Sequence, residues 1–323
     1  MLKNALVSVV IPTHNRPLLV MDAVASALAQ TYAALEVIVV IDGSDSETFA
    51  LLQSCSDLRL KIIYLNENVG GAEARNIGAR AACGEWIAFL DDDDTWLPEK
   101  LEKQLACATI VGSSIPIVSS SLIEKRNGGS QHILPRRLYQ TGEDVSEYLF
   151  CRRSFAYGDG MLQTSTLLTR RSLLLDIPFQ KGLRRHQDWD WLLRAVQQPD
   201  VAITMLSEPL TIMRVEEQGQ SVSRSVDWET SFVWAERMRP HMTPKAYSFF
   251  LATECITRAR KSGAGLKMAV QLFRAYLRNG RPSLRSLCLF LGFFAMPPDL
   301  QRWRRKQQRQ NFITLSCEQF HFL

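Results

Sequence analysis

The alternation of apolar runs with helical segments over the first hundred residues constrains the fold of this chain more than any other feature. Apolar runs of strand length occur at 6–12, 36–42, 60–66 and 85–91. Helical spacing follows each of them, at 17–30, 44–53, 70–83 and from Thr95 onward. Strands buried on both faces and joined by helices are typical of a parallel sheet covered by helices. The pattern therefore predicts an α/β fold with a mostly parallel sheet.

The remaining two thirds of the chain divide near residue 225. "PIVSSSLIEK" and "SQHILPRRL" flank "RNGG", which predicts a hairpin, and "VAITML" and "PLTIMRV" read as short strands. Helical patterns then cover 227–238, 243–260, 264–279 and 283–295. We expect a catalytic domain over 1–225 and a helical region over 226–323, associated with the membrane or with an acceptor.

Composition excludes several classes of protein. Hydrophobic residues make up 46% of the 323 residues, enough for a folded core, and a net charge of +5 is too small to indicate nucleic-acid binding. The seven cysteines are scattered and include no C-x-x-C pair, which argues against a zinc or redox motif and favours a reducing compartment. The N-terminus reads as a first strand, so we expect a cytoplasmic protein.

Polar residues follow three of the predicted strands where each strand ends. Thr13, Asp42 and the run Asp91–Asp94 all fall at these positions. Parallel sheets bind ligands at the carboxyl ends of their strands, so the aspartate run is either a solvated acidic turn or a site for Mg²⁺ or Mn²⁺. Its position favours the metal. If the run were extended, Asp91 and Asp93 would point the same way.

Four motifs extend this interpretation. "VSVVIPTHNRP", "EVIVVIDGSDSET", "NENVGGAEARNIGARAACGEWIAFLDDDDTWLPEKLEKQ" and "HQDWDWLLR" occur in this order. Over roughly residues 5–225 the chain resembles family 2 glycosyltransferases of the GT-A fold. The resemblance implies an inverting transfer of a sugar from a nucleotide-diphosphate sugar, most often a UDP-sugar. The acceptor would be a saccharide or a lipid-linked hydroxyl in cell-surface polysaccharide or lipopolysaccharide synthesis.

The resemblance also implies roles for particular residues. Those expected at the nucleotide-sugar are Pro12, Thr13, Asn15, Asp42, Arg75, Asp91 and Asp92. Asp91 would face the ribose and Asp93 would hold Mn²⁺ or Mg²⁺ on the diphosphate. Because Asp94 is often acidic in relatives too, the assignment within the run stays open by one residue.

"HQDWDW" supplies the carboxylate that the reaction needs as a base. A positioned general base removes the proton of the attacking hydroxyl, and Asp188 matches the position of the family's catalytic aspartate. Single displacement with this base would invert the anomeric configuration. The alternative is that Asp188 only caps the following helix. Asp190 is expected to be structural and Trp191 to lie in the core, while the role of Trp189 is left open.

The chain departs from the family pattern at three places. Ile41-Asp42 replaces the usual pair of aspartates, and Gln187 stands where a glutamate is usual. Relatives often place a histidine after the strand matching "TIMRV", where this chain has Glu216 and Glu217. Either glutamate, or neither, would be the third metal ligand.

Residues 281–310 hold about ten apolar residues between basic flanks, too few to span a bilayer, which needs about 20. They form either a buried helix or an interfacial helix at an anionic membrane, which would make the protein peripheral at the inner face of the cell membrane. Two other functions compete with sugar transfer: a metal-dependent nucleotidyltransferase and a non-catalytic sugar-nucleotide-binding module. "IPTHNRP" lacks the glycines expected of the first, and the second would be expected to have lost its carboxylates.

Overall fold

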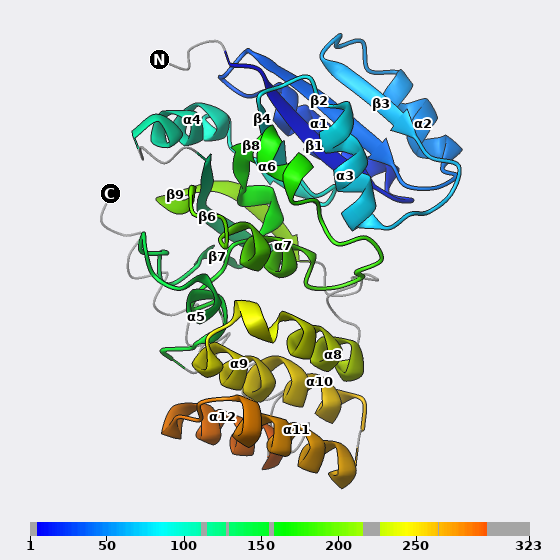
Figure 1. Ribbon diagram of the computed structural model, residues 1–323. Coiled ribbons are helices and arrows are strands. Elements are labelled where there is room, and N and C mark those ends of the chain that lie inside the picture. Colours follow the sequence, from blue (N-terminus) through cyan, green and yellow to red (C-terminus); the bar gives the residue numbers. More distant parts are fainter. Residues whose placement is uncertain are drawn as a thin grey trace. The chain divides into compact units, whose positions relative to one another are not determined.

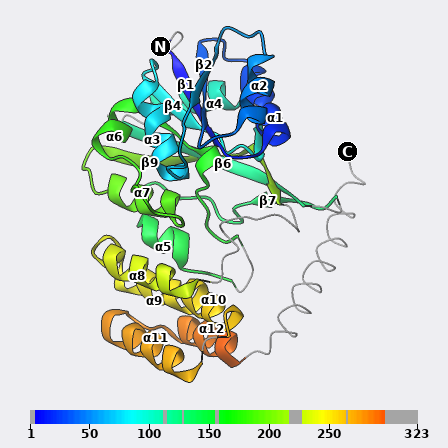
Figure 2. The same cartoon turned by 90° about the vertical axis from the view of Figure 1, so that its right-hand side faces the viewer.

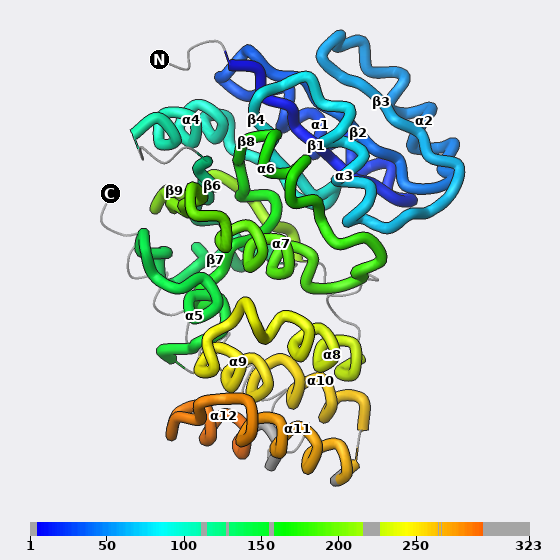
Figure 3. The backbone as a smooth tube through the Cα atoms, in the orientation of Figure 1, coloured from blue at the N-terminus to red at the C-terminus, as the bar shows by residue number. Residues whose placement is uncertain are grey.

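The computed structural model describes residues 5–110, 115–126, 129–154, 158–215, 227–263 and 265–295. The chain forms two compact units, residues 1–222 and 223–323. Figures 1 and 3 follow both units along the sequence.

A mixed sheet forms the centre of the first unit. Its strands are β1 (Val7–Thr13), β2 (Leu35–Ile41), β3 (Leu60–Tyr64), β4 (Trp86–Phe89), β5 (Asp94–Trp96), β6 (Ile115–Arg126), β7 (Gln131–Leu134), β8 (Leu168–Arg170) and β9 (Val201–Val215). They lie in the order β3-β2-β1-β4-β8-β6-β9-β5, with β7 beside β6. The first four pair in parallel, as predicted. The other half of the sheet is mixed, because β8 runs antiparallel to β4 and β6, and β5 antiparallel to β9.

Helices cover both faces of this sheet, as Figure 2 shows. They are α1 (Pro17–Leu28), α2 (Ser46–Gln53), α3 (Gly71–Ala81), α4 (Lys100–Ile110), α5 (Val145–Phe150), α6 (Arg171–Asp176) and α7 (Gln187–Ala195). Alternate residues of β1 enter different cores: Val10 packs with α3, α6 and α7, while Val9 and Ile11 pack with α1 and α4. Helix α3 approaches β1 closely at Gly78, where a Cβ would lie 2.4 Å from Val10 Cγ1.

Three local predictions can be compared with the structure. The hairpin around "RNGG" is confirmed by the antiparallel pairing of β6 and β7, which sets Leu122 opposite Leu134. The helix expected from Thr95 begins only at Lys100, because residues 94–96 pair with β9 as strand β5. The two short strands expected over 201–215 are one strand, β9, which runs parallel to β6 across a register shift.

The second unit is helical. Its elements are α8 (Trp228–Met238), α9 (Pro244–Phe250), a π-helical turn (Leu251–Cys255), α10 (Ile256–Lys261), α11 (Leu266–Asn279) and α12 (Leu284–Ala295). The four predicted helical segments are confirmed, since α9, the π turn and α10 run on without a break. Its core includes Trp234, Tyr247, Phe250, Leu272 and Tyr276. Across the described ranges, no helix is long and apolar enough to cross a membrane.

Candidate active site

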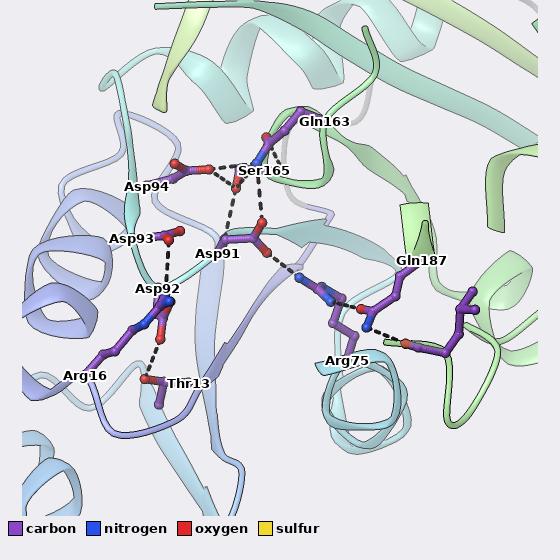
Figure 4. A network of polar contacts seen from close by, with 11 residues as sticks. Thr13, Arg16, Arg75, Asp91, Asp92, Asp93, Asp94, Gln163, Ser165 and Gln187 are labelled. Carbon is purple, nitrogen blue, oxygen red and sulfur yellow. Dashed lines mark hydrogen bonds and ion pairs between the residues drawn. The ribbon is translucent and has the colours of Figure 1, made fainter. Parts of the chain in front are cut away.

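The aspartate run forms a tight turn between β4 and β5. The Asp94 N–H donates to the Asp91 carbonyl at 3.1 Å, and Asp94 is already the first residue of β5. The run is therefore not extended, because β4 ends at Phe89 and the chain reverses, so the condition under which Asp91 and Asp93 would point the same way is not met. The four carboxylates instead reach different partners (Figure 4).

Two of the four carboxylates are buried and support the turn. Asp92 accepts hydrogen bonds from Thr13 Oγ1 and from Arg16 Nη1, both at 2.9 Å. Asp94 accepts from Ser165 Oγ at 2.7 Å and from Gln163 Nε2 at 2.8 Å. Burial raises the pKa of both groups. The carboxylate oxygens of Asp92 and Asp94 therefore accept hydrogen bonds from other side chains of the protein.

The other two carboxylates reach solvent. The side chain of Asp91 is 26% exposed and pairs with Arg75, and that of Asp93 is 39% exposed and lies 2.9 Å from Arg16 Nη1. Partial burial, together with the charges of Asp91 and Asp92, raises the pKa of Asp93 to about 6. Because such neighbours repel one another as anions, a bound cation would relieve the repulsion.

A divalent cation held by Asp93 would need further ligands from outside the protein. The part of the chain that the structure describes holds no group of three His, Cys, Asp or Glu side chains suited to a metal. Glu216 and Glu217 lie outside the described residues. Mg²⁺ usually takes one or two carboxylates and completes its shell with water and substrate phosphates. The donor set suits an ion that arrives with a diphosphate.

The remaining residues expected at the nucleotide line the ends of β1 and β2. Both carboxylate oxygens of Asp42 accept backbone N–H groups, from Val69 at 2.6 Å and from Gly70 at 2.9 Å. Gly70 has φ +85°, which glycine adopts without strain, so Asp42 secures the loop that enters α3. Pro12 is buried in β1, whereas Asn15 is exposed and its N–H donates to Asp45 at 2.9 Å.

Asp188 lies in the first turn of α7 and is partly exposed. The N-cap of α7 is His186, in the left-handed conformation at φ 61°, so the alternative that Asp188 is the cap is wrong. Burial raises the pKa of Asp188 to about 6, against the Trp189 N–H that donates to it at 2.9 Å. The charge of Asp91 raises this pKa further and that of Arg75 lowers it. Asp188 thus lies within electrostatic reach of the aspartate turn.

Arg75 connects the two halves of the site. One guanidinium nitrogen pairs with Asp91, and Nη1 donates to Gln187 Oε1 at 2.7 Å (Figure 4). Gln187 Nε2 in turn donates to the Leu183 carbonyl at 2.6 Å. The residue that departs from the family pattern therefore holds the arginine against the start of α7.

The two other residues of the "HQDWDW" motif for which the sequence predicted a structural role, Asp190 and Trp191, have that role in the structure. Asp190 is buried and pairs with Arg194 at 2.8 Å, and Trp191 is fully buried with its N–H on the Ile177 carbonyl, as expected. Trp189, whose role was open, stacks on His186 with ring centroids 4.9 Å apart.

Sequence reasoning missed three residues of the network: Arg16, Gln163 and Ser165. Arg16 could have been found, since it is a cation in the loop after β1, at the same sheet edge as the aspartates. Gln163 and Ser165 lie about seventy residues from the turn they support, in a segment without periodicity, and no local signal marks them.

The fold is an α/β fold with a carboxylate-lined edge of the sheet, and comparison with known proteins gives the class of the protein. Residues 8–172 match the model of glycosyl transferase family 2. The chain belongs to this family and is a glycosyltransferase. This membership rules out the nucleotidyltransferase alternative.

Several relatives are named for polysaccharide biosynthesis, and two of them illustrate the similarity to this chain. The amylovoran biosynthesis glycosyltransferase AmsB of Erwinia amylovora is 27% identical over 288 residues, which cover 87% of this chain and 93% of AmsB. The putative teichuronic acid biosynthesis glycosyltransferase TuaG of Bacillus subtilis is 33% identical over 161 residues, which cover 49% of this chain and 58% of TuaG.

Among solved structures the chain is similar to S. aureus TarS, with a TM-score of 0.57 and 21% identity over 88% of this chain. It spans half the length of that TarS chain. A shorter TarS structure, residues 1–349 in complex with UDP-GlcNAc, gives a TM-score of 0.55 and 19% identity over 89% of this chain and 79% of the other. This likeness confirms the GT-A fold.

Proposed function

We propose that this protein is an inverting glycosyltransferase that moves a sugar from a nucleotide-diphosphate sugar, a UDP-sugar in the first instance, to a hydroxyl group. The acceptor is a saccharide or a lipid-linked saccharide in the synthesis of a cell-surface polysaccharide or lipopolysaccharide. The names of AmsB and TuaG support the pathway class, and the UDP-GlcNAc complex of TarS supports the donor. The observation that carries the proposal is the Asp91–Arg75–Gln187 bridge, which sets Asp188 beside the aspartate turn.

Asp188 acts as the base in this proposal. Its carboxylate accepts the proton of the acceptor hydroxyl while the oxygen bonds to the anomeric carbon. The bond from that carbon to the diphosphate breaks, its electron pair leaves with the nucleoside diphosphate, and the configuration inverts. A positioned base of this kind contributes a factor on the order of 10²–10⁴ to the rate.

The donor side is formed by the aspartate turn and the ends of β1 and β2. Thr13, Asn15 and Asp42 border the nucleoside, and Arg75 contributes positive charge near the phosphates. Asp91 faces the ribose. Asp93 would hold Mn²⁺ or Mg²⁺, which when bound supplies Lewis-acid stabilisation of the leaving diphosphate.

The proposal places the protein at the inner face of the cell membrane, with peripheral contact through residues 281–310. The scattered cysteines, which include no C-x-x-C pair, support a reducing compartment, and the basic flanks of 281–310 support contact with anionic lipid. Of this segment the structure describes α12 and the residues before it.

Calorimetric titration of UDP and GDP, with and without Mn²⁺, tests the donor site. We expect metal-dependent binding of UDP to the wild type and its loss in Asp93→Ala. Asp57→Ala, which removes an equal charge from an Asp57–Arg59 surface pair, is the matched control and should bind like the wild type. Binding of neither nucleotide to folded protein, or equal binding by Asp93→Ala, would contradict the proposed site.

The anomeric configuration of the product, read by NMR, tests the reaction. Inversion is expected, and a retained configuration would rule out the single displacement with Asp188 as its base.

A further inference from the structure

The second unit carries a concentrated positive charge. Residues 256–295 contain no aspartate or glutamate and eight basic residues: Arg258, Arg260, Lys261, Lys267, Arg274, Arg278, Arg281 and Arg285. This segment alone is more positive than the whole chain, whose net charge is +5. The last five of these residues lie on α11, α12 and the turn between them, and all five are exposed.

Helices α11 and α12 lie side by side (Figures 1 and 2). The rings of Tyr276 and Phe290 are 5.2 Å apart, and Tyr276 Oη is 2.7 Å from Ser286 Oγ. Leu272 and Leu289 are buried beside them. Helix α11 packs on α9, and α12 on α10 and the π turn. Their opposite faces are therefore directed outward together.

The outward face of α12 is largely apolar, whereas that of α11 combines apolar residues with polar ones, among them Lys267, Arg274 and Arg278. Val270 and Leu277 lie two turns apart on α11, and Leu284 and Leu291 two turns apart on α12. Their exposed fractions are 41%, 54%, 80% and 50%. Cys288 lies between the last two and is exposed. A helix that shows leucines to solvent at this spacing, flanked by arginine and lysine, has the pattern of a helix lying in a membrane interface.

We propose that this outer face of α11 and α12, defined by Val270, Leu277, Leu284 and Leu291 and their basic neighbours, docks on the surface of an anionic lipid bilayer. The proposal deepens the membrane contact of the proposed function and rests on it for its biological meaning. It shifts the contact from 281–310 to a surface that begins at Lys267. Insertion of the leucines removes apolar area from water, and each flanking cation gains about 1 kcal/mol near an anionic surface.

The positive charge of this face favours an anionic bilayer over two other possible occupants, a second copy of the chain and the segment after residue 295. A second copy of the chain would bring an equally basic face against this one, without a carboxylate between 256 and 295 to balance it. The segment after residue 295 contains "QRWRRKQQR", which is basic as well and would be repelled from the same face. An anionic bilayer would bury the leucines in its apolar region and attract the cations to its headgroups.

Flotation of the full chain with vesicles tests the docking. We expect binding to phosphatidylcholine vesicles that contain phosphatidylglycerol and little binding to phosphatidylcholine alone. Removing two charges, in Arg274→Gln with Arg278→Gln, should weaken binding about 30-fold at about 1 kcal/mol each. Leu277→Asn with Leu284→Asn should weaken it more than tenfold. Lys125→Gln and Leu58→Asn, which alter exposed residues of the first unit, are the matched controls.

Thiol labelling locates the contact. Cys288 should react with a maleimide in free protein and become protected by anionic vesicles, whereas Cys83, exposed in the first unit, should react equally in both states. Protection of Cys288 without vesicles would show that protein already covers the face and would overturn the proposal. So would equal binding to neutral vesicles, or unchanged binding of the double arginine and double leucine variants.

The membrane test stands apart from the catalytic one. Asp188→Asn should bind vesicles like the wild type, and the α11 and α12 variants should keep their activity on a soluble acceptor. A wild-type chain that binds vesicles but transfers no sugar from any nucleotide-sugar would therefore refute the proposed reaction and leave the docking surface in place.

Discussion

Replacing Asp188 by asparagine should make the protein more stable and far less active. Folding raises the pKa of this carboxyl from 3.8 to about 6, chiefly through burial. A difference of roughly two pH units corresponds to about 3 kcal/mol of destabilisation while the group is ionised at neutral pH. Because the side chain is partly exposed, solvent screens some of this cost. We expect Asp188→Asn to gain about 1–3 kcal/mol at pH 7.

The sign of the pH dependence follows from the same shift. Between about pH 4 and 6 the folded protein binds a proton at Asp188 more tightly than the unfolded chain does, so this group costs stability as the pH rises through the window. The asparagine variant lacks that contribution. Its advantage over the wild type should therefore be small near pH 4 and full above pH 6.

The activity should change in the opposite direction. Only the carboxylate accepts a proton, so kcat/KM of the wild type for the acceptor, at saturating Mn²⁺ and UDP-sugar, should rise about tenfold per pH unit below pH 6 and level off above it. Under the same conditions Asp188→Asn should lower kcat/KM for the acceptor by a factor on the order of 10²–10⁴ at pH 7.5 and abolish this acid limb.

Urea denaturation at pH 5 and 7, with steady-state kinetics on a UDP-sugar, checks both halves of the prediction. Asp190→Asn is the control on the same helical turn. Asp190 is buried on Arg194, so its loss should cost about 1–3 kcal/mol and leave the acid limb in place. If Asp188→Asn were less stable than the wild type at pH 7, or kept activity within tenfold, the assignment of the base would be wrong.

Three further predictions concern the site and the packing around it. Gln187→Glu adds a carboxylate beside Asp188, which should raise the pKa of Asp188 and move the acid limb of the kcat/KM profile to higher pH. An unchanged pH profile would show that residue 187 does not influence Asp188. Binding of Mn²⁺ with UDP should weaken as the pH falls through about 6, where Asp93 takes up its proton, and titrations of Asp93→Asn should be weaker and lack this dependence. Gly78→Ala should lower the free energy of unfolding by about 1–3 kcal/mol, because its Cβ would lie 2.4 Å from a β1 side chain. Gly292→Ala in α12 meets nothing within 4 Å and should raise it by about 0.5–1 kcal/mol. Similar changes for both variants in urea denaturation would refute this contrast.

The first four strands were predictable because each is buried on both faces and so reads as a continuous apolar run. Val9 and Val10 enter opposite cores although they are neighbours in the chain, and no alternation marks such a strand. Strand β5 was not predictable, since three residues carry no period. Its pairing with β9 decides that Asp94–Trp96 is extended, against a local pattern that favours a helix.

The candidate site was predictable as a location and less so as an arrangement. Strand ends meet at one edge of a parallel sheet, which brings Thr13 to Asp92. The partners Gln163 and Ser165 come from a segment far along the chain and follow from the packing of β8 between β4 and β6. Only the folded chain could show that Gln187, a departure from the family pattern, accepts a hydrogen bond from Arg75.

The chain can accommodate four consecutive aspartates because two of the carboxylates are buried with hydrogen-bond donors and the other two are partly exposed. Arg16 forms an ion pair with Asp92 and Thr13 donates a hydrogen bond to it, while Gln163 and Ser165 donate hydrogen bonds to Asp94, whose pKa burial raises. If all four faced solvent, repulsion between neighbours would oppose the turn; if all four were buried, no oxygen would remain for a ligand. Burying alternate members of the run leaves Asp91 and Asp93 partly exposed, on one turn and with a raised pKa at Asp93. The carboxylates that destabilise the fold are therefore those to which the proposed reaction assigns a role. The residues that stabilise the turn, Arg16, Gln163 and Ser165, are those that the sequence pattern did not identify.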